Sequence, residues 1–138
     1  MGKAQRTKGA SAERELAALL SDRLGTLVKR RLGAARDGGH DLDGGLMLDS
    51  VSIEVKRQEK PSLGPWWSQA CDQAARAAKV PVLAYRASRC AWSFRVPLGW
   101  VHAGFSTSDT DMTVTMGIEE FCAVVREAMT VQEEPSKA

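Results

Sequence analysis

The segment 51–57, VSIEVKR, constrains the fold most, because an apolar alternation carries two charged residues at a fixed spacing. Side chains alternate across a β-strand with a period of two, so Glu54 and Lys56 lie on one face of a strand here. The β-branched residues Val51, Ile53 and Val55 lie on the other face, which we predict to be packed in the core. Such a strand holds a carboxylate and an ammonium group side by side on a rigid element.

A second carboxylate, Asp41, precedes this strand in the glycine-rich segment 33–45. Glycines allow a turn and let another backbone come close, so Asp41 can approach Glu54. Mg²⁺ is often held by only one or two carboxylates together with substrate phosphates. Lys56 could then orient or deprotonate a water molecule, or face negative charge developing on a phosphate. The simpler alternative is a solvated charge pair, since Glu-x-Lys is common on strands.

Composition limits the other classes of function. The chain has 138 residues, of which 43% are hydrophobic and 26% are charged, as expected for one globular domain with a core. No apolar run approaches the roughly 18 residues of a membrane span, and the N-terminus lacks the apolar region of a secretory signal, so we expect a cytoplasmic protein. The three cysteines have no C-x-x-C spacing or histidine cluster, which argues against a zinc site. We expect them to be reduced and buried.

Charge is distributed unevenly along the chain. Residues 1–36 contain nine Lys and Arg against three acids, whereas residues 104–138 contain two against seven. This asymmetry suggests one face for a polyanion such as DNA and another turned away from it. Each basic residue taken alone is also compatible with ordinary solvated surface. The candidates for phosphate contact are Lys8, Lys29, Arg30, Arg31, Arg36 and Arg57.

Apolar periodicity predicts an α/β protein with a mixed sheet flanked by helices. The expected helices cover Ser11 to Leu24, 65–79 and 118–129. The expected strands cover 26–32, 46–49, 51–57, 80–85 and 92–98, with further candidates at 100–103 and 112–116. We expect a single domain over 10–130, a flexible basic arm over 1–9 and a polar tail over 131–138.

Glu13 is the unusual residue of the first expected helix. At 100° per residue it falls inside the apolar stripe that Leu16 and Leu20 define. An unpaired buried charge is costly, so this carboxylate either has a partner or reaches solvent from the start of the helix.

The segments KGASAERELAALL, GGHDLDG and SIEVKRQ occur in the order found in the PD-(D/E)XK nuclease superfamily, which the chain resembles over residues 8–86. Within it the sequence looks most like the Holliday-junction resolvases of archaea and small phage-encoded nucleases. The resemblance implies a restriction-endonuclease-like core and an active site that includes Glu13, Glu54 and Lys56. Asp41 matches the first acid of the motif, with His40 in place of the usual proline. Asp43 remains a competing ligand.

The resemblance further implies hydrolysis of DNA phosphodiester bonds with Mg²⁺ or Mn²⁺. Asp41 and Glu54 would hold the ion with the Val55 carbonyl, Glu13 would complete the acidic cluster, and Gln69 is a second-tier candidate. A four-way-junction resolvase acting in DNA recombination as a homodimer is the expected function, in a bacterial or phage-infected cell. Alternatives are another structure-specific, nicking or restriction-like nuclease, an inactive DNA-binding module on the same fold, or an ordinary α/β domain with accidental motifs.

Overall fold

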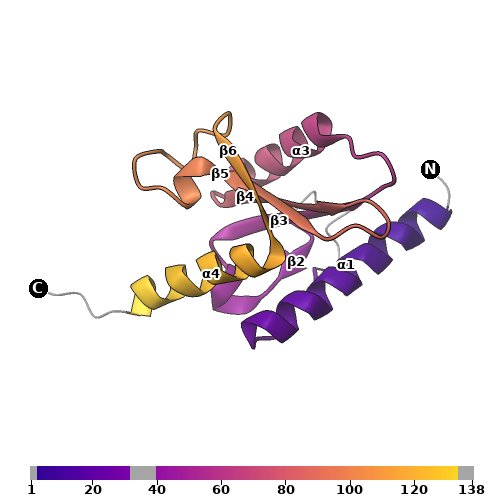
Figure 1. The fold of residues 1–138 in the computed structure, drawn as a ribbon, viewed down its shortest axis with the longest axis horizontal. Helices are drawn as coiled ribbons and strands as arrows, with labels where there is room; N and C mark the ends of the chain where they lie inside the picture. Colours follow the sequence, from indigo (N-terminus) through magenta and orange to yellow (C-terminus); the bar gives the residue numbers. More distant parts are fainter. Residues whose placement is uncertain (1–2, 32–39, 134–138) are drawn as a thin grey trace, which may run out of the picture.

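A four-stranded mixed sheet with helices on both faces forms the centre of the protein (Figure 1). The computed structural model describes the backbone of residues 3–31 and 40–133, and the side chains of residues 9–31 and 40–128. The strand order is β3-β4-β5-β6, in which β3 and β4 are parallel and the other neighbours antiparallel. These strands are β3 (Val51–Arg57), β4 (Val80–Arg86), β5 (Ser93–Pro97) and β6 (Thr113–Gly117). The predicted α/β architecture is confirmed.

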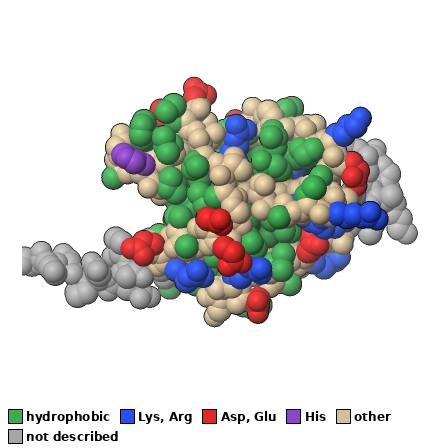
Figure 2. Space-filling view, viewed as in Figure 1, with side chains coloured by type: hydrophobic (Ala, Val, Ile, Leu, Met, Phe, Trp, Pro, Cys, Tyr) green, Lys and Arg blue, Asp and Glu red, His purple; other side chains and the backbone are tan. Residues whose placement is uncertain are grey.

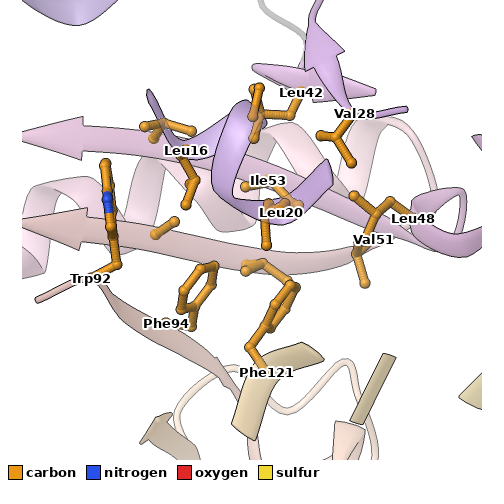
Figure 3. Close-up of a cluster of buried hydrophobic side chains, with 14 of the residues drawn as sticks. Leu16, Leu20, Val28, Leu42, Leu48, Val51, Ile53, Trp92, Phe94 and Phe121 are labelled. Carbon is orange, nitrogen blue, oxygen red and sulfur yellow. The ribbon is translucent and has the colours of Figure 1, made fainter. Parts of the chain in front are cut away.

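The main core lies between one face of this sheet and two helices, α1 (Lys3–Leu24) and α4 (Ile118–Glu133). Ile53 of β3 is fully buried there, as the alternation predicts, together with Leu16 and Leu20 of α1 (Figure 3). Phe94 of β5 stacks on Phe121 of α4 with ring centroids 4.4 Å apart. Offset aromatic pairs of this kind add to the stabilisation that burial provides.

The opposite face of the sheet is covered by α3 (Leu63–Arg76), which connects β3 to β4. Its Trp66 and Ala70 pack on Leu83 of β4, and Leu83 is the register neighbour of Glu54 in β3. Small residues on this helix let it lie close to the sheet. Glu54 is therefore enclosed between the sheet and the α3 layer, because it shares a face with these apolar groups.

A short antiparallel ribbon continues the sheet beside β3. It consists of β1 (Lys29–Arg30) and β2 (Leu42–Asp43), with Arg30 opposite Leu42. Asp41 joins the ribbon to the sheet, since its backbone N–H donates to the Ile53 carbonyl and its own carbonyl accepts from the Arg31 N–H, both at 2.8 Å. The residue that the motif marks as acidic is thus held on two sides by backbone hydrogen bonds.

The first helix begins earlier than predicted. It starts at Lys3, so residues 3–9 form its first turns and the expected arm over 1–9 is wrong for them; residues 1–2 lie outside the described part. Ser11, where the predicted helix began, lies inside the observed one. Lysine, alanine, glutamine and arginine in residues 3–9 are good helix formers, whereas Thr7 and Gly9 weaken the helix.

Three predicted strands differ in the structure. The strand expected over 26–32 is limited to Lys29–Arg30 within the described residues, and 46–49 is part of the 3₁₀ helix Gly45–Leu48. Gly45 has a φ of 63°, in the left-handed region that glycine readily adopts, and this turns the chain away from a strand. The strand expected over 100–103 is a turn after the 3₁₀ helix Leu98–Trp100, where Trp100 packs on Phe121 at 5.4 Å.

The remaining expectations are met in part. Cys122 is buried, Cys71 is half-buried and Cys90 is exposed, so the prediction of three buried cysteines is wrong for Cys90; all three are free thiols. The last helix runs to Glu133, and the rest of the expected polar tail lies outside the described residues. In the described ranges, no helix combines the length and the apolar character that crossing a membrane requires.

One ion pair joins the basic N-terminal part of the chain to the acidic C-terminal part. Arg23 of α1 pairs with Glu119 of α4, where these two helices are in contact. On the face seen in Figure 2, basic and acidic side chains are interspersed along the half of the molecule that holds these two helices. On this face, the described side chains do not divide into one basic and one acidic side.

Candidate active site

A cavity of about 590 Å³ brings together four residues that are distant in sequence. Glu13 comes from α1, Asp41 from the link between the ribbon and the sheet, and Glu54 and Lys56 from β3. The four residues that the sequence analysis selected as catalytic thus line one shared space. They would have no reason to converge in an ordinary domain with accidental motifs.

Asp41 is fixed by the strand that carries the rest of the motif. Its Oδ2 accepts a hydrogen bond of 2.8 Å from the Val55 N–H, and the residue is only 9% exposed. A carboxylate bonded to the backbone of β3 at this point lies directly beside Glu54. The register of β3 with the ribbon, rather than side-chain flexibility, sets the distance between the two acids.

Glu54 and Lys56 are not a solvated charge pair. Glu54 is 5% exposed, and its Oε1 lies 3.5 Å from Lys56 Nζ. A buried carboxylate is far more expensive than an exposed one, and a partner at this distance offsets only part of that cost. The sequence alternative of a surface pair is therefore wrong for these two residues.

Burial and neighbouring charge oppose the ionisation of Asp41 in particular. Burial, and next the negative charge of Glu54, raise the pKa of Asp41 to about 8 from its ordinary 3.8, although the Val55 N–H acts the other way. Burial also raises the pKa of Glu54, while Lys56 lowers it. A divalent cation beside them would offset the negative charge and the lost hydration, with the carboxylate oxygens as its ligands. The donor set therefore fits such an ion.

Glu13 has a partner of its own. Its Oε2 accepts from Arg30 Nε at 2.7 Å, which answers how a carboxylate inside the apolar stripe of α1 is accommodated. It is still close enough to raise the pKa values of Asp41 and Glu54. Within the side chains that the structure describes, no group of three or more acids, histidines or cysteines is close enough to hold one ion. The compact donor set is thus Asp41 and Glu54, with Glu13 beside it.

The other predicted residues lie elsewhere. Asp43 does not line the cavity, and its Oδ1 is 2.6 Å from His40 Nε2. Gln69 is exposed on α3 and does not line the cavity either. Lys29 is exposed and Arg31 is half-buried, whereas the Lys8 side chain and Arg36 fall outside the described residues.

Several lining residues were not singled out from the sequence as part of the site. Gly9 faces the cavity from α1, and the segment 58–60 continues its wall beyond β3. Gly9 and Gln58 lie inside the matched segments KGASAERELAALL and SIEVKRQ, and residues 59–60 directly follow the second, so position was their only signal. Arg57 also lines the cavity, although the sequence placed it only among residues for DNA contact.

The comparison with known families settles the class of protein. A family model described as "Phage putative PDDEXK endonuclease" matches residues 4–131 of the sequence. The chain belongs to this family. The PD-(D/E)XK resemblance read from three short segments is thereby confirmed, and the protein is a nuclease of that superfamily.

A solved structure supports the fold. The PD-(D/E)XK chain is similar to Hjc of Archaeoglobus fulgidus, a Holliday junction resolvase from an archaeal hyperthermophile. The TM-score is 0.52 at 18% sequence identity, over 83% of this chain and 96% of that chain. At this level of sequence identity, the structural similarity shows a shared restriction-endonuclease-like fold. No curated protein sequence matches the chain.

The pKa of Asp41 generates a prediction about stability. With metal removed by EDTA, folded Asp41 stays protonated up to about pH 8, whereas in the unfolded chain it ionises above its ordinary value of 3.8. Rising pH between these values therefore favours unfolding, because the unfolded state releases the proton first. Asp41→Asn still accepts from Val55 but does not titrate. We expect its melting temperature to exceed that of the wild type increasingly from pH 5 to pH 8. A difference that stays constant over this range would show that Asp41 is not a raised-pKa group.

Proposed function

We propose that this protein is a divalent-metal-dependent DNA endonuclease that cuts four-way junctions. The single observation that carries the proposal is the convergence of buried Asp41 and Glu54 with Lys56 in one cavity. The charges of these two buried carboxylates oppose folding at neutral pH. Their presence is explained if they hold an ion for catalysis. Membership of an endonuclease family supplies the class of reaction.

Asp41 and Glu54 would hold Mg²⁺ or Mn²⁺ through their carboxylate oxygens, with the Val55 carbonyl as a further ligand from the same strand. Bound there, the ion would supply positive charge to the phosphate oxygens and make a water molecule more acidic. Lys56 is placed beside Glu54 on a rigid strand, so its Nζ can position the attacking water and face the charge that develops on phosphorus. Glu13 completes the acidic wall and is oriented by Arg30.

DNA is the proposed partner, and the cations around the site would bind its phosphates. Lys29, Arg31 and Arg57 are the described candidates, with Lys8 and Arg36 as candidates from the sequence alone. Arg30 is bound to Glu13, so we propose that it acts by holding that carboxylate rather than as a free phosphate ligand. Such a protein would act in the cytoplasm of a bacterium or a phage-infected cell, on DNA undergoing recombination.

The junction is the finer part of this proposal. The similar fold of Hjc, which is a Holliday junction resolvase, makes a four-way junction the first substrate to test. Cutting a junction into two duplexes requires two incisions on opposite strands, which two copies related by a two-fold axis would provide. We therefore propose a homodimer. A nicking, flap or restriction-like nuclease would use the same cavity on a different DNA.

Removing either partner of the buried charge pair should abolish cleavage. We expect Glu54→Gln and Lys56→Ala each to lower the cleavage rate about 100-fold or more, because each removes electrostatic stabilisation at the reacting phosphate. The measurement is single-turnover cleavage of labelled DNA with Mg²⁺. Asp43→Asn is the matched control, since Asp43 lies near Asp41 in sequence but outside the cavity, and it should retain nearly full activity. Full cleavage by Glu54→Gln, or equal loss in the Asp43 variant, would contradict the assignment.

The metal requirement has its own test. EDTA should stop cleavage, Mg²⁺ or Mn²⁺ should restore it, and Ca²⁺ should allow DNA binding with little turnover, because Ca²⁺ accepts oxygen ligands in a looser geometry. Undiminished cleavage in EDTA after dialysis would refute metal dependence.

Substrate choice is tested with a panel of a four-way junction, a flap, a duplex and a single strand of related sequence. The proposal predicts that the junction is cut fastest and that cuts appear in pairs on opposing strands. If the junction is cut no faster than the duplex, the resolvase function is wrong and the nuclease assignment stands.

A further inference from the structure

Arg57, the last residue of β3, lines the active-site cavity. Its Nε is buried, and no hydrogen-bond acceptor or ion-pair partner for this side chain exists in the part of the chain that the structure describes. Enclosing a guanidinium donor without an acceptor costs free energy, because the hydration it loses is not replaced. Packing of the fold does not explain why a buried donor with this free-energy cost lies beside a catalytic site.

The neighbouring arginine shows that packing alone does not require this arrangement. Arg86 is the register partner of Arg57 on β4, two positions after a core residue just as Arg57 is, so both project from the same sheet face. Arg86 donates from Nε and Nη2 to the two carboxylate oxygens of Glu15, at 2.9 and 2.8 Å, and lies over the Trp92 ring. Two equivalent positions thus hold one arginine paired within the fold and one that is unpaired.

Three of the four acids that line the cavity with Arg57 are already engaged, and the fourth, Glu59, is exposed to solvent. Glu13 is bound by Arg30, and Glu54 is paired with Lys56. Asp41 accepts from the Val55 backbone. No described acid is therefore held against Arg57, and a guanidinium offers N–H groups in a planar fork that fits two phosphate oxygens of a ligand.

Gly9 leaves room for such an anion. It lies inside α1 and lines the same cavity, and a Cβ built on it would meet no atom within 4 Å. Glycine weakens a helix relative to alanine, so the residue that keeps this space open also costs the helix some stability. The unpaired charge and the open wall belong to one cavity and differ from the groups assigned to catalysis.

We propose that Arg57, with the open wall at Gly9, binds one phosphate of the DNA backbone next to the phosphate that is cut. This inference rests on the proposed function, because it takes DNA as the ligand. By alternation Arg57 projects to the opposite face of β3 from Lys56, so the two cations hold different phosphates of one strand. Arg57 is thus a substrate-positioning residue, which fixes the register of the strand in the cavity.

The first test compares Arg57→Gln with Arg86→Gln, the same chemical change at paired positions. Affinity is measured in Ca²⁺ for the DNA of the panel that the wild type cuts fastest, and the cleavage rate is measured separately in Mg²⁺ with enzyme in excess. Arg57→Gln should raise the Kd about tenfold or more, reduce the salt dependence by about one phosphate contact, and leave the melting temperature unchanged or higher. Arg86→Gln should lower the melting temperature and keep the Kd of the wild type. The cleavage rate of Arg57→Gln at saturation should fall much less than that of Lys56→Ala.

The second test locates the phosphate. Single methylphosphonates, which lack the negative charge, are placed in turn at each position around the mapped cut site. One position next to the cut should weaken wild-type binding about tenfold and weaken binding by Arg57→Gln no further, because the partner is already lost. Gly9→Leu, which fills the open wall, should weaken DNA binding while remaining folded.

The outcomes separate this inference from the proposed function. Suppose that the wild type cleaves DNA. An unchanged Kd for Arg57→Gln would then overturn the phosphate site alone. So would methylphosphonates that weaken binding by Arg57→Gln as much as binding by the wild type at every position. Absence of metal-dependent cleavage by the wild type on every DNA of the panel would overturn the proposed function itself.

Discussion

The hydrogen bond from the Val55 N–H to Asp41 Oδ2, 2.8 Å long, is the contact on which the site depends. It ties a carboxylate from a short ribbon to the backbone of the strand that carries Glu54 and Lys56. With the bond from the Asp41 N–H to the Ile53 carbonyl, it sets the ribbon in register with β3. Without this register Asp41 and Glu54 would not lie side by side, and their carboxylate oxygens could not bind one ion together.

The same strand provides both the core and the chemistry. One face of β3 is held by apolar packing under α1 and α4, so the strand cannot move to relieve the charges on its other face. Burial therefore raises the pKa values of Asp41 and Glu54 instead of exposing them to water. The fold bears a local electrostatic cost here, which a bound cation would offset. Strongly shifted pKa values of this kind cluster at functional sites.

The sequence predicted most of this site because its information is local. Alternation in 51–57 correctly separated the face that packs in the main core from the face of Glu54 and Lys56, and motif order selected Asp41, which lines the cavity, over Asp43, which does not. Partners far along the chain could not be predicted. Arg30 and Glu13 are 17 residues apart and Arg86 and Glu15 are 71 apart, so their pairing follows from tertiary packing. The early start of α1 and the 3₁₀ helix at Gly45–Leu48 were missed because the local sequence favours no secondary structure strongly there, so the surrounding fold decides it.

The central claim is that Asp41 and Glu54 form one buried site for a divalent cation. Titration of the metal-free protein with Mn²⁺, followed by electron paramagnetic resonance of the free ion, tests it without reference to catalysis. We predict that the wild type and Asp43→Asn bind Mn²⁺ with the same affinity, and that Glu54→Gln binds it at least about tenfold more weakly while keeping the circular dichroism of the folded protein. Equal Mn²⁺ affinity in the wild type and in Glu54→Gln would contradict the account.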